Sequence, residues 1–463
     1  MEASNGSARG GALFLAALVL GLAVRLASLP LPGTGDMGVY RLWTYNAAVQ
    51  NPARLYGVGG PPGEWHRLEF DGTDGVITYP PLAIYELGIA GRVYRLLNGG
   101  AFPNTIALVF AIKALILVFE TGLIWMLFAG IRRLTNEATA RWATMAYWLN
   151  PSMILAGSML GYVDALAMLP AAAAVYASSS GWPLVSGALI TAATLSKPQC
   201  LLLMPGTALV ILGADDWRGM LTRALRYGAG VVLAAALILG PIVAIGAWPN
   251  LWFAMSGLAR HDMLSGNATN LWWIIGYAVR VQHSLDMGVW NAITAETRIL
   301  AISRFMEVGY PNPRVIGTSI TILVMLWGLW TGRRARDWFL LSAVGAFLIH
   351  AYATLAAQVH ENHLYSAVPL LVIAASRDTR YRRLLWVVSA IFALNLNVFY
   401  GISEFEYRGS YMVPRMMSVL DLTVWLSLAS CATLVWHAVL LKRVCADPAV
   451  LERRGDYRRA ITT

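Results

Sequence analysis

Charged residues are scarce in this sequence, and lysine is almost missing. Charged residues make up 13% of the 463 residues, about half of the ~25% that is usual for soluble domains. Lysine occurs only at positions 113, 197 and 442, so the net charge of +10 comes almost wholly from arginine. These arginines form short clusters between apolar runs instead of covering one domain, which argues against a nucleic-acid partner.

Cysteine is also rare. The three cysteines, at positions 200, 431 and 445, have neither the spacing of a zinc site nor the number of a disulfide framework. We interpret them as small apolar side chains. The sequence therefore indicates no cysteine-based metal or redox site.

Long hydrophobic runs dominate what is present. Hydrophobic residues make up 57% of the chain and the mean hydropathy is +0.57, which predicts an all-α, polytopic membrane helical bundle. The first run continues to Pro30 with no small-x-small cleavage site, so we interpret it as a span and not as a signal peptide. The twelve predicted spans are 11–29, 106–129, 142–159, 164–178, 184–196, 200–213, 228–247, 315–331, 338–356, 364–376, 384–402 and 417–440. Several are short, and we expect the chain to be broken or bent near 160 and 198.

Loop charge predicts the orientation. The arginine clusters fall in alternate loops, and the positive-inside rule puts those loops and both termini in the cytoplasm. Two long segments, 30–104 and 248–313, then face the external side. We predict one transmembrane domain over 1–441, with these two segments building the active site, and a basic cytoplasmic tail over 442–463. Residues 82–97 follow two prolines and have one apolar face, which predicts a helix in the membrane interface.

Polar residues that loop solvation does not explain all fall on the external side. Whole spans separate the motifs that carry them. If each motif fell on either side with equal probability, the other four would share the side of the first about one time in sixteen. The shared side predicts one site built from distant segments. Its candidate residues are Asp36, Arg41, Asp164, Lys197, Arg260, His261, Asn267, Asn270, His360 and Glu361.

Each of these residues has a structural alternative. Asp36 and Asp164 could cap the helices that follow them, and Lys197 could extend from a helix end to the interface. His360 and Glu361 could be an ordinary interfacial pair; in "HENH" the histidines are three apart, which is not the metalloprotease spacing.

Two further charges lie inside the second span. Lys113 and Glu120 are seven residues apart and hence on one helix face. Intramembrane charges are functional candidates by default, but a structural partner elsewhere in the bundle is an equal alternative.

Taken together, several stretches resemble the GT-C superfamily of integral-membrane glycosyltransferases. The resemblance is to the glucosyltransferases of asparagine-linked glycan assembly in the endoplasmic reticulum, and to bacterial proteins similar to the second GPI mannosyltransferase. It covers residues 11–376 and depends on the order and shared side of the motifs. In chain order these are "GDMGVYRLW", "TYPPLAIYEL", which contains Tyr79, "LNPSMILAGSMLGYVDAL", "LSKPQCLLLMP", "NATNLW" and "HENHLY".

The resemblance implies an activity. The expected donor is a hexose linked through a monophosphate to a polyprenol, and the expected acceptor is a glycolipid or cell-envelope glycan. We expect Asp36 to be the general base of an inverting transfer. Cationic and polar groups at headgroup depth, namely Arg41, Lys197, Arg260, His261, His360 and Glu361, would hold the donor phosphate and sugar. Asp164, Tyr79, Asn267 and Asn270 are further site candidates.

The remaining expectations concern the sugar, metals and rival functions. The turn at Asp164 is shorter than in the endoplasmic reticulum enzymes and lacks their histidines; between mannose and glucose we favour mannose. We expect no cofactor and no obligatory metal, the alternative being a divalent site at Asp36, Asp164 and Glu361. A nucleotide-sugar donor is disfavoured, because Asp215 and Asp216 are adjacent and not in Asp-x-Asp spacing. The main rival is a transporter or lipid flippase, which would bind its substrate near the bilayer midplane. The arginine-rich usage favours a bacterial plasma membrane.

Overall fold

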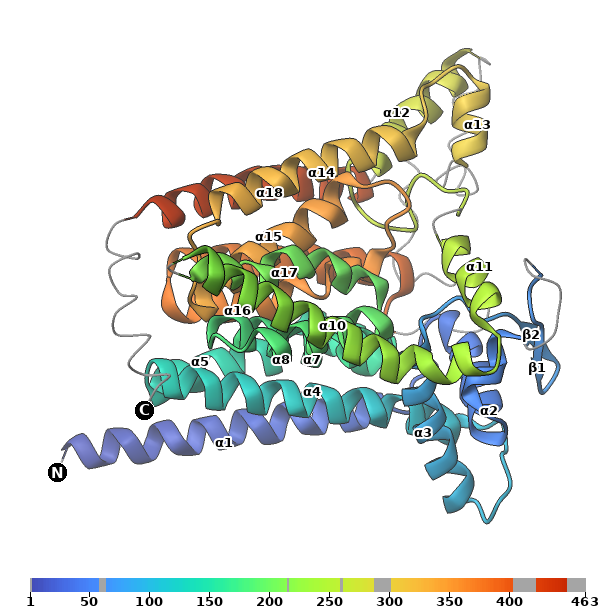
Figure 1. Cartoon of the computed structure of the whole chain (residues 1–463), viewed down its shortest axis with the longest axis horizontal. Helices are drawn as coiled ribbons and strands as arrows, with labels where there is room; N and C mark the ends of the chain where they lie inside the picture. The colour runs from blue at the N-terminus through green and yellow to red at the C-terminus, as the bar shows by residue number, and fades with distance from the viewer. Residues whose placement is uncertain are drawn as a thin grey trace.

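The computed structural model describes residues 2–57, 64–214, 216–258, 261–286, 301–402 and 422–447. Its helices lie side by side in a layered bundle, with both ends of the described chain at one end of the bundle (Figure 1). The two long segments predicted to be external lie at the other end, which carries α2, α3, α11 and a small hairpin. The arrangement confirms an all-α polytopic membrane protein.

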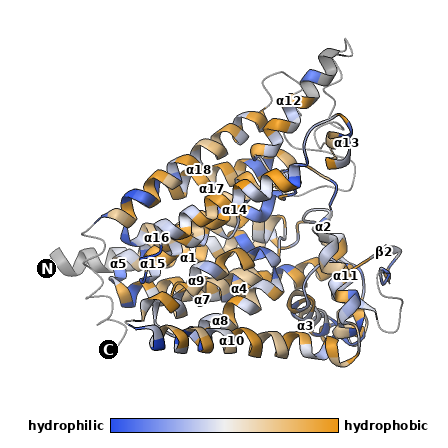
Figure 2. Ribbon diagram, turned by 45° about the horizontal axis from the view of Figure 1, so that its top comes forward, coloured by the Kyte–Doolittle hydropathy of each residue, from blue (hydrophilic) through white to orange (hydrophobic). Residues whose placement is uncertain are grey.

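In the described part of the chain, seven helices are long and apolar enough to cross a membrane. Their outer faces are hydrophobic (Figure 2), and residues such as Leu237 on α10, Leu323 on α14 and Val435 on α18 are exposed. An exposed apolar surface of this extent suits contact with lipid. The seven are α1 (Glu2–Ser28), α4 (Ile106–Leu134), α10 (Trp217–Ala244), α14 (Pro313–Thr331), α15 (Trp338–Leu355), α17 (Arg380–Tyr400) and α18 (Leu422–Ala446). Because α18 continues to Ala446, the predicted start of the tail at 442 falls inside a helix, and 448–463 lie outside the described residues.

The other five predicted spans are short or broken helices inside the bundle. As expected, the helical path is broken near 160, where a π-helical turn ends at Met159 and the next helix starts at Asp164, and again at Lys197, where α-helix gives way to a 3₁₀ turn. A further break, which was not expected, lies at Asn150. Irregular backbone is tolerated at membrane depth where other helices cover it, and α7 is almost wholly buried. The elements are α5 (Glu137–Trp148), α6 (Pro151–Met153), the π-helical turn η2 (Ile154–Met159), α7 (Asp164–Ser179), α8 (Pro183–Ser196), η3 (Pro198–Leu203), α9 (Met204–Ala208), η4 (Ile211–Gly213) and α16 (Ala367–Arg377).

The long segments fold into short elements at the end of the bundle. The first forms α2 (Asp36–Val49), η1 (Pro52–Tyr56), an antiparallel hairpin that pairs β1 (Leu68–Phe70) with β2 (Thr73–Gly75), and α3 (Pro81–Leu97). The second contains α11 (Trp248–Leu258), α12 (Leu271–Asp286) and α13 (Ile302–Glu307). Asn250 Nδ2 donates to the Gly57 carbonyl at 3.1 Å, which ties the two segments together.

Helix α3 confirms that residues 82–97 are helical, and it has a second packed face besides the predicted apolar one. One face packs on α2, where Gly91 lies so close that an added Cβ would meet the Thr44 carbonyl oxygen at 2.6 Å. The opposite face exposes Ile89, Val93 and Leu96, which is consistent with the predicted place in the membrane interface. Helix α2, which begins with Asp36, is therefore held against α3.

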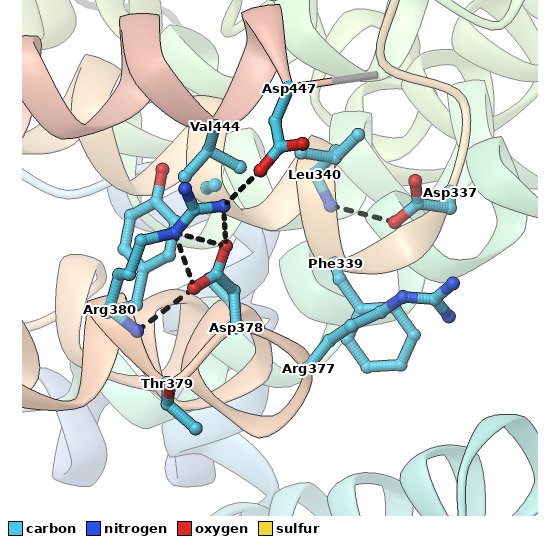
Figure 3. Close-up of a pocket in the computed structure, with 12 residues that line it drawn as sticks. Asp337, Phe339, Leu340, Arg377, Asp378, Thr379, Arg380, Val444 and Asp447 are labelled. Atoms are coloured by element: carbon cyan, nitrogen blue, oxygen red, sulfur yellow. Dashed lines mark hydrogen bonds and ion pairs between the residues drawn. The ribbon is translucent and has the colours of Figure 1, made fainter. Parts of the chain in front are cut away.

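The end of the bundle that holds the termini has its own polar cavity (Figure 3). Its volume is about 240 Å³. Arg380 crosses it and pairs with Asp378 at 2.6 Å and with Asp447 at 3.2 Å, which joins the start of α17 to the end of α18. We interpret this cluster as a structural tie between helix ends.

Both intramembrane charges of the second span have structural partners. Glu120 accepts from Arg25 Nε of α1 at 2.8 Å, and both side chains are fully buried. The Arg25 guanidinium also donates to the Trp148 carbonyl at 2.7 Å and lies 3.7 Å from the Trp148 ring centroid. Lys113 is equally buried and donates to two backbone carbonyls. These contacts join helices, which favours the structural alternative for both residues.

The Arg25–Glu120 pair yields a stability prediction. Replacing Arg25 with Met strands the buried Glu120 carboxylate, and breaking a buried pair in this way costs about 3–5 kcal/mol. The double change Arg25→Met with Glu120→Leu removes both charges and should recover most of that loss. Reversible unfolding in detergent measures both effects. Equal losses in the single and the double variant would show that the pair is not coupled.

Candidate active site

Backbone hydrogen bonds join two segments of the candidate site that are far apart in the sequence. The Gly266 amide donates to the Val359 carbonyl at 2.8 Å, and the Glu361 amide donates to the Gly266 carbonyl at 3.0 Å. Gly266 has no side chain, which lets the His360 ring lie against it; a Cβ there would meet His360 Nδ1 at 2.6 Å. The pairing fixes His360 and Glu361 at the end of α15 relative to the second long segment.

Asp36 is the first residue of α2, and its carboxylate accepts no hydrogen bond from any residue that the structure describes. The N-cap of α2 is Gly35, so the capping alternative for Asp36 does not hold. The side chain is exposed, yet burial raises the pKa of its carboxyl, with His360 and Lys197 opposing the rise and Asp164 adding to it. Asp36 therefore lies near enough to His360, Lys197 and Asp164 for their charges to act on its carboxyl group.

Lys197 and Asp164 form a buried ion pair within this group. The Lys197 ammonium donates to Asp164 Oδ2, and both side chains are 4% exposed. Asn362 Nδ2 donates to the same carboxylate oxygen at 3.0 Å. Burial is the largest single influence and would lower the pKa of Lys197, but Asp164, Tyr79 and Asp36 together outweigh it, and the pKa is raised. The pair replaces both structural alternatives, since Asp164 caps no helix and Lys197 does not extend into solvent.

Glu361 lies beside this pair in η7 (Glu361–Leu364). Its carboxylate accepts from the Tyr162 hydroxyl, and its Oε2 lies 4.0 Å from His360 Nδ1. Burial raises the pKa of Glu361 to about 7, with the Tyr162 hydrogen bond opposing the rise. Burial also lowers the pKa of His360, so that its imidazole tends toward the neutral form. The site thus holds one carboxylate that solvent reaches and a second that is buried and titrates near neutrality.

Tyrosine side chains also contact residues of the candidate site. The Tyr79 ring centroid lies 5.9 Å from Lys197 Nζ, and the Tyr79 hydroxyl lies 3.3 Å from that of Tyr40 on α2. Asn267, in the left-handed region at φ 59°, donates from Nδ2 to the Tyr400 hydroxyl at 3.0 Å. The predicted residues Tyr79 and Asn267 therefore both contact segments that contribute to the candidate site.

Three other predicted residues are not shown to join Asp36. Asn270 accepts from the Trp273 amide at 3.1 Å and so caps α12. Arg41 points toward Asn104, with Nη1 to Oδ1 at 3.5 Å. Arg260 lies outside the described residues. His261 lies at the edge of the site, with its ring centroid 5.8 Å from that of His360.

Tyr162, Asn362 and Tyr400 contact residues of the candidate site but were not predicted from the sequence. Tyr162 and Asn362 lie inside the motifs "GYVDAL" and "HENH". Each is close in sequence to a candidate carboxylate, which is the feature that could have identified it. Tyr400 ends a span with no motif around it, and only tertiary packing brings it to Asn267.

Among the described residues, no three His, Cys, Asp or Glu side chains are grouped so that they could hold a metal ion. Asp36, Asp164 and Glu361 are not grouped in this way, and the expectation of no obligatory metal stays a prediction. Because Lys197 already occupies Asp164, the residues present suit an anionic group better than a cation.

The arrangement can support proton transfer next to an anion. Asp36, which is exposed, can accept a proton from a hydroxyl group that approaches it. The nearby Lys197 and His360 carry N–H donors that can stabilise negative charge developing on an oxygen.

The comparisons with known proteins give little further information. No protein-family model matches the sequence, and no characterised protein sequence matches it. The fold is similar to the crystal structure of the Archaeoglobus fulgidus oligosaccharyltransferase in the apo form, with a TM-score of 0.38 and 12% sequence identity over 96% of this chain and 59% of that protein. Likeness at this level does not establish a shared activity.

Glu361 yields a prediction for stability against pH. Its pKa is about 7 in the folded protein and ordinarily 4.5, so between these values the folded state keeps a proton that the unfolded chain releases. Stability should therefore fall as the pH rises through this window. Glu361→Gln cannot ionise, so its Tm relative to the native protein should rise from pH 4.5 to 7. Exposed Glu64→Gln is the control, and a constant difference for Glu361→Gln would contradict the shift.

Proposed function

We propose that the protein is an inverting glycosyltransferase that moves a hexose from a polyprenyl-phosphate donor to a glycolipid or cell-envelope glycan. One observation carries the proposal. The Asp36 carboxylate is exposed, and it lies near enough to Lys197 and His360 at one end of a membrane bundle for both to influence its pKa. This is the layout that transfer from an anchored phosphate ester to a hydroxyl group needs.

In the reaction, the acceptor hydroxyl group loses its proton to the Asp36 carboxylate as its oxygen attacks the anomeric carbon. The new carbon–oxygen bond forms while the bond to the phosphate oxygen breaks, and polyprenyl phosphate leaves. Attack from the face opposite the phosphate inverts the anomeric centre. Burial makes Asp36 a stronger base than an ordinary aspartate, because it raises the pKa of the carboxyl.

Lys197 would hold the phosphate through its remaining N–H donors. An ammonium group has three N–H donors. Asp164 holds the Lys197 ammonium by accepting a hydrogen bond from one of them. His360, which is part-exposed, would add a donor at the same depth. Arg260 and His261 stay candidates for the same task.

Lipid contact at the site end supports a lipid-linked donor. The exposed face of α3 and the exposed Trp252 of α11 lie at the end of the bundle that also carries α2. Tryptophan is enriched at membrane interfaces. A donor whose sugar phosphate lies at headgroup depth could reach the site while its lipid chain stays in the bilayer.

The residues that favoured a transporter, which would bind its substrate near the bilayer midplane, have structural partners. Lys113 and Glu120 were the only candidates for a midplane site, and both are engaged with Arg25 or with backbone carbonyls. The other candidate charges gather at one end. We therefore propose a transferase with its site on the extracytoplasmic side, mannose as the favoured sugar and no obligatory metal.

The base is tested with Asp36→Asn, which keeps the shape and removes the basicity. Turnover with polyprenyl-phosphate mannose or glucose and a lipid acceptor should fall by at least ~10²-fold. Donor binding and the unfolding midpoint should stay close to native. Native-like turnover would rule out Asp36 as the base, and activity restored only by a divalent cation after EDTA would revive the metal alternative.

The phosphate contact is tested with Lys197→Ala. Loss of the ammonium should raise the donor KM or lower kcat by about 10-fold or more, since charge-assisted hydrogen bonds contribute ~1.5–3 kcal/mol. The double change Asp164→Asn with Lys197→Met controls for the stranded Asp164 charge. Unaltered KM and kcat in Lys197→Ala would leave this lysine with a purely structural role.

A further inference from the structure

Lys113 is the one buried lysine of the described chain that the proposed chemistry leaves unused. It lies in the second turn of α4 with 0% of its surface exposed. Its ammonium donates to the Leu31 carbonyl at 2.6 Å and to the Met159 carbonyl at 2.7 Å. A buried ammonium loses several kcal/mol of hydration, so these acceptors are what makes a lysine tolerable here.

The two carbonyls lie at or just beyond a helix end. Met159 is the last residue of η2, and Leu31 lies in the turn three residues after Ser28, the last residue of α1. The last carbonyls of a helix have no partner within it, and the negative end of the helix dipole favours a cation there. Lys113 therefore caps the end of η2 and at the same time binds the turn that follows α1.

These two ends lead directly into the candidate site. Leu31 stands five residues before Asp36, and Met159 stands five residues before Asp164. The loops also touch each other, because the Thr34 amide donates to the Leu160 carbonyl at 3.1 Å. Lys113 is thus the side chain that holds the base-bearing loop and the loop of the Lys197 partner at one spacing.

The packing around the ammonium leaves little freedom for any other arrangement. Gly161 adopts φ +80°, and a Cβ there would meet Met37 Cε at 2.4 Å and Lys113 Cε at 3.0 Å. Gly33 adopts φ +88°, and its Cβ would meet the Leu160 carbonyl oxygen at 2.9 Å. Glycine at both positions lets the two loops close around the lysine stem.

We propose that Lys113 is a positioning residue, which sets Asp36 against the Asp164–Lys197 pair by clamping the two loops. It touches no reacting atom and acts only through the backbone. The catalytic part of this inference rests on the proposed function, whereas the clamp itself does not.

The clamp is tested by hydrogen exchange in Lys113→Met, which keeps the length of the side chain and removes its donors. Amides of residues 33–37 and 160–164 should exchange at least ~10-fold faster than in the native protein, while the rest of the bundle changes less. Arg25→Met, which removes another buried cation from the neighbouring helix, is the matched control. Lys113→Arg keeps donors and charge and should restore part of the protection.

The consequence for catalysis is tested by kinetics on the same variants. A base displaced by about 1 Å can lose up to ~10²-fold in rate, so kcat should fall 10- to 100-fold in Lys113→Met with the donor KM within twofold of native. Lys113→Arg should recover part of kcat, which a general loss of stability would not produce.

Two results would overturn the inference. One is native exchange in both loops of folded Lys113→Met. The other is a rise in exchange spread as evenly as in Arg25→Met. If Lys113→Met does not fold, Lys113→Gln takes its place, since its amide keeps two N–H donors on a shorter stem. If the native protein transfers no hexose, the proposed function fails, and the exchange experiment still decides the clamp.

Discussion

The buried ion pair between Asp164 and Lys197 is the interaction on which the site depends. It joins the start of α7 to the end of α8, and Asn362 adds the chain after α15 to the same carboxylate oxygen. Neither charge could stay buried alone, because an uncompensated ion in a low-dielectric interior is strongly unfavourable. The pair therefore forces three segments to meet, and Asp36 takes its electrostatic surroundings from them.

The fold was largely predictable from the sequence, because hydrophobic runs and loop charge are properties of short windows. Alternation of sides alone put Asp36, Asp164, Lys197 and His360 at one end of the bundle. The breaks near 160 and 198 also followed from runs too short to span. The five short helices were harder to define, since burial by neighbouring helices, and not their own length, makes them stable.

The partners inside the site were not predictable in the same way. Both carboxylates could have capped their helices, and the choice was made by packing: Asp164 meets a lysine from another helix, while Asp36 meets none. Asn270, which carries the same side chain as Asn267 three residues away, was taken up by the start of α12. Such outcomes depend on contacts between residues far apart in sequence, which no local pattern contains.

The close packing of α3 on α2 has a mechanical consequence. At Gly91 the backbone of α3 lies directly against Thr44 and Ala48 of α2, with no space for a side chain on α3. The opposite face of α3 is turned outward, with Ile89, Val93 and Leu96 exposed. Because the two helices are so closely packed, we expect a tilt that bilayer thickness or curvature imposes on α3 to displace α2 as well, together with the carboxylate at its first residue.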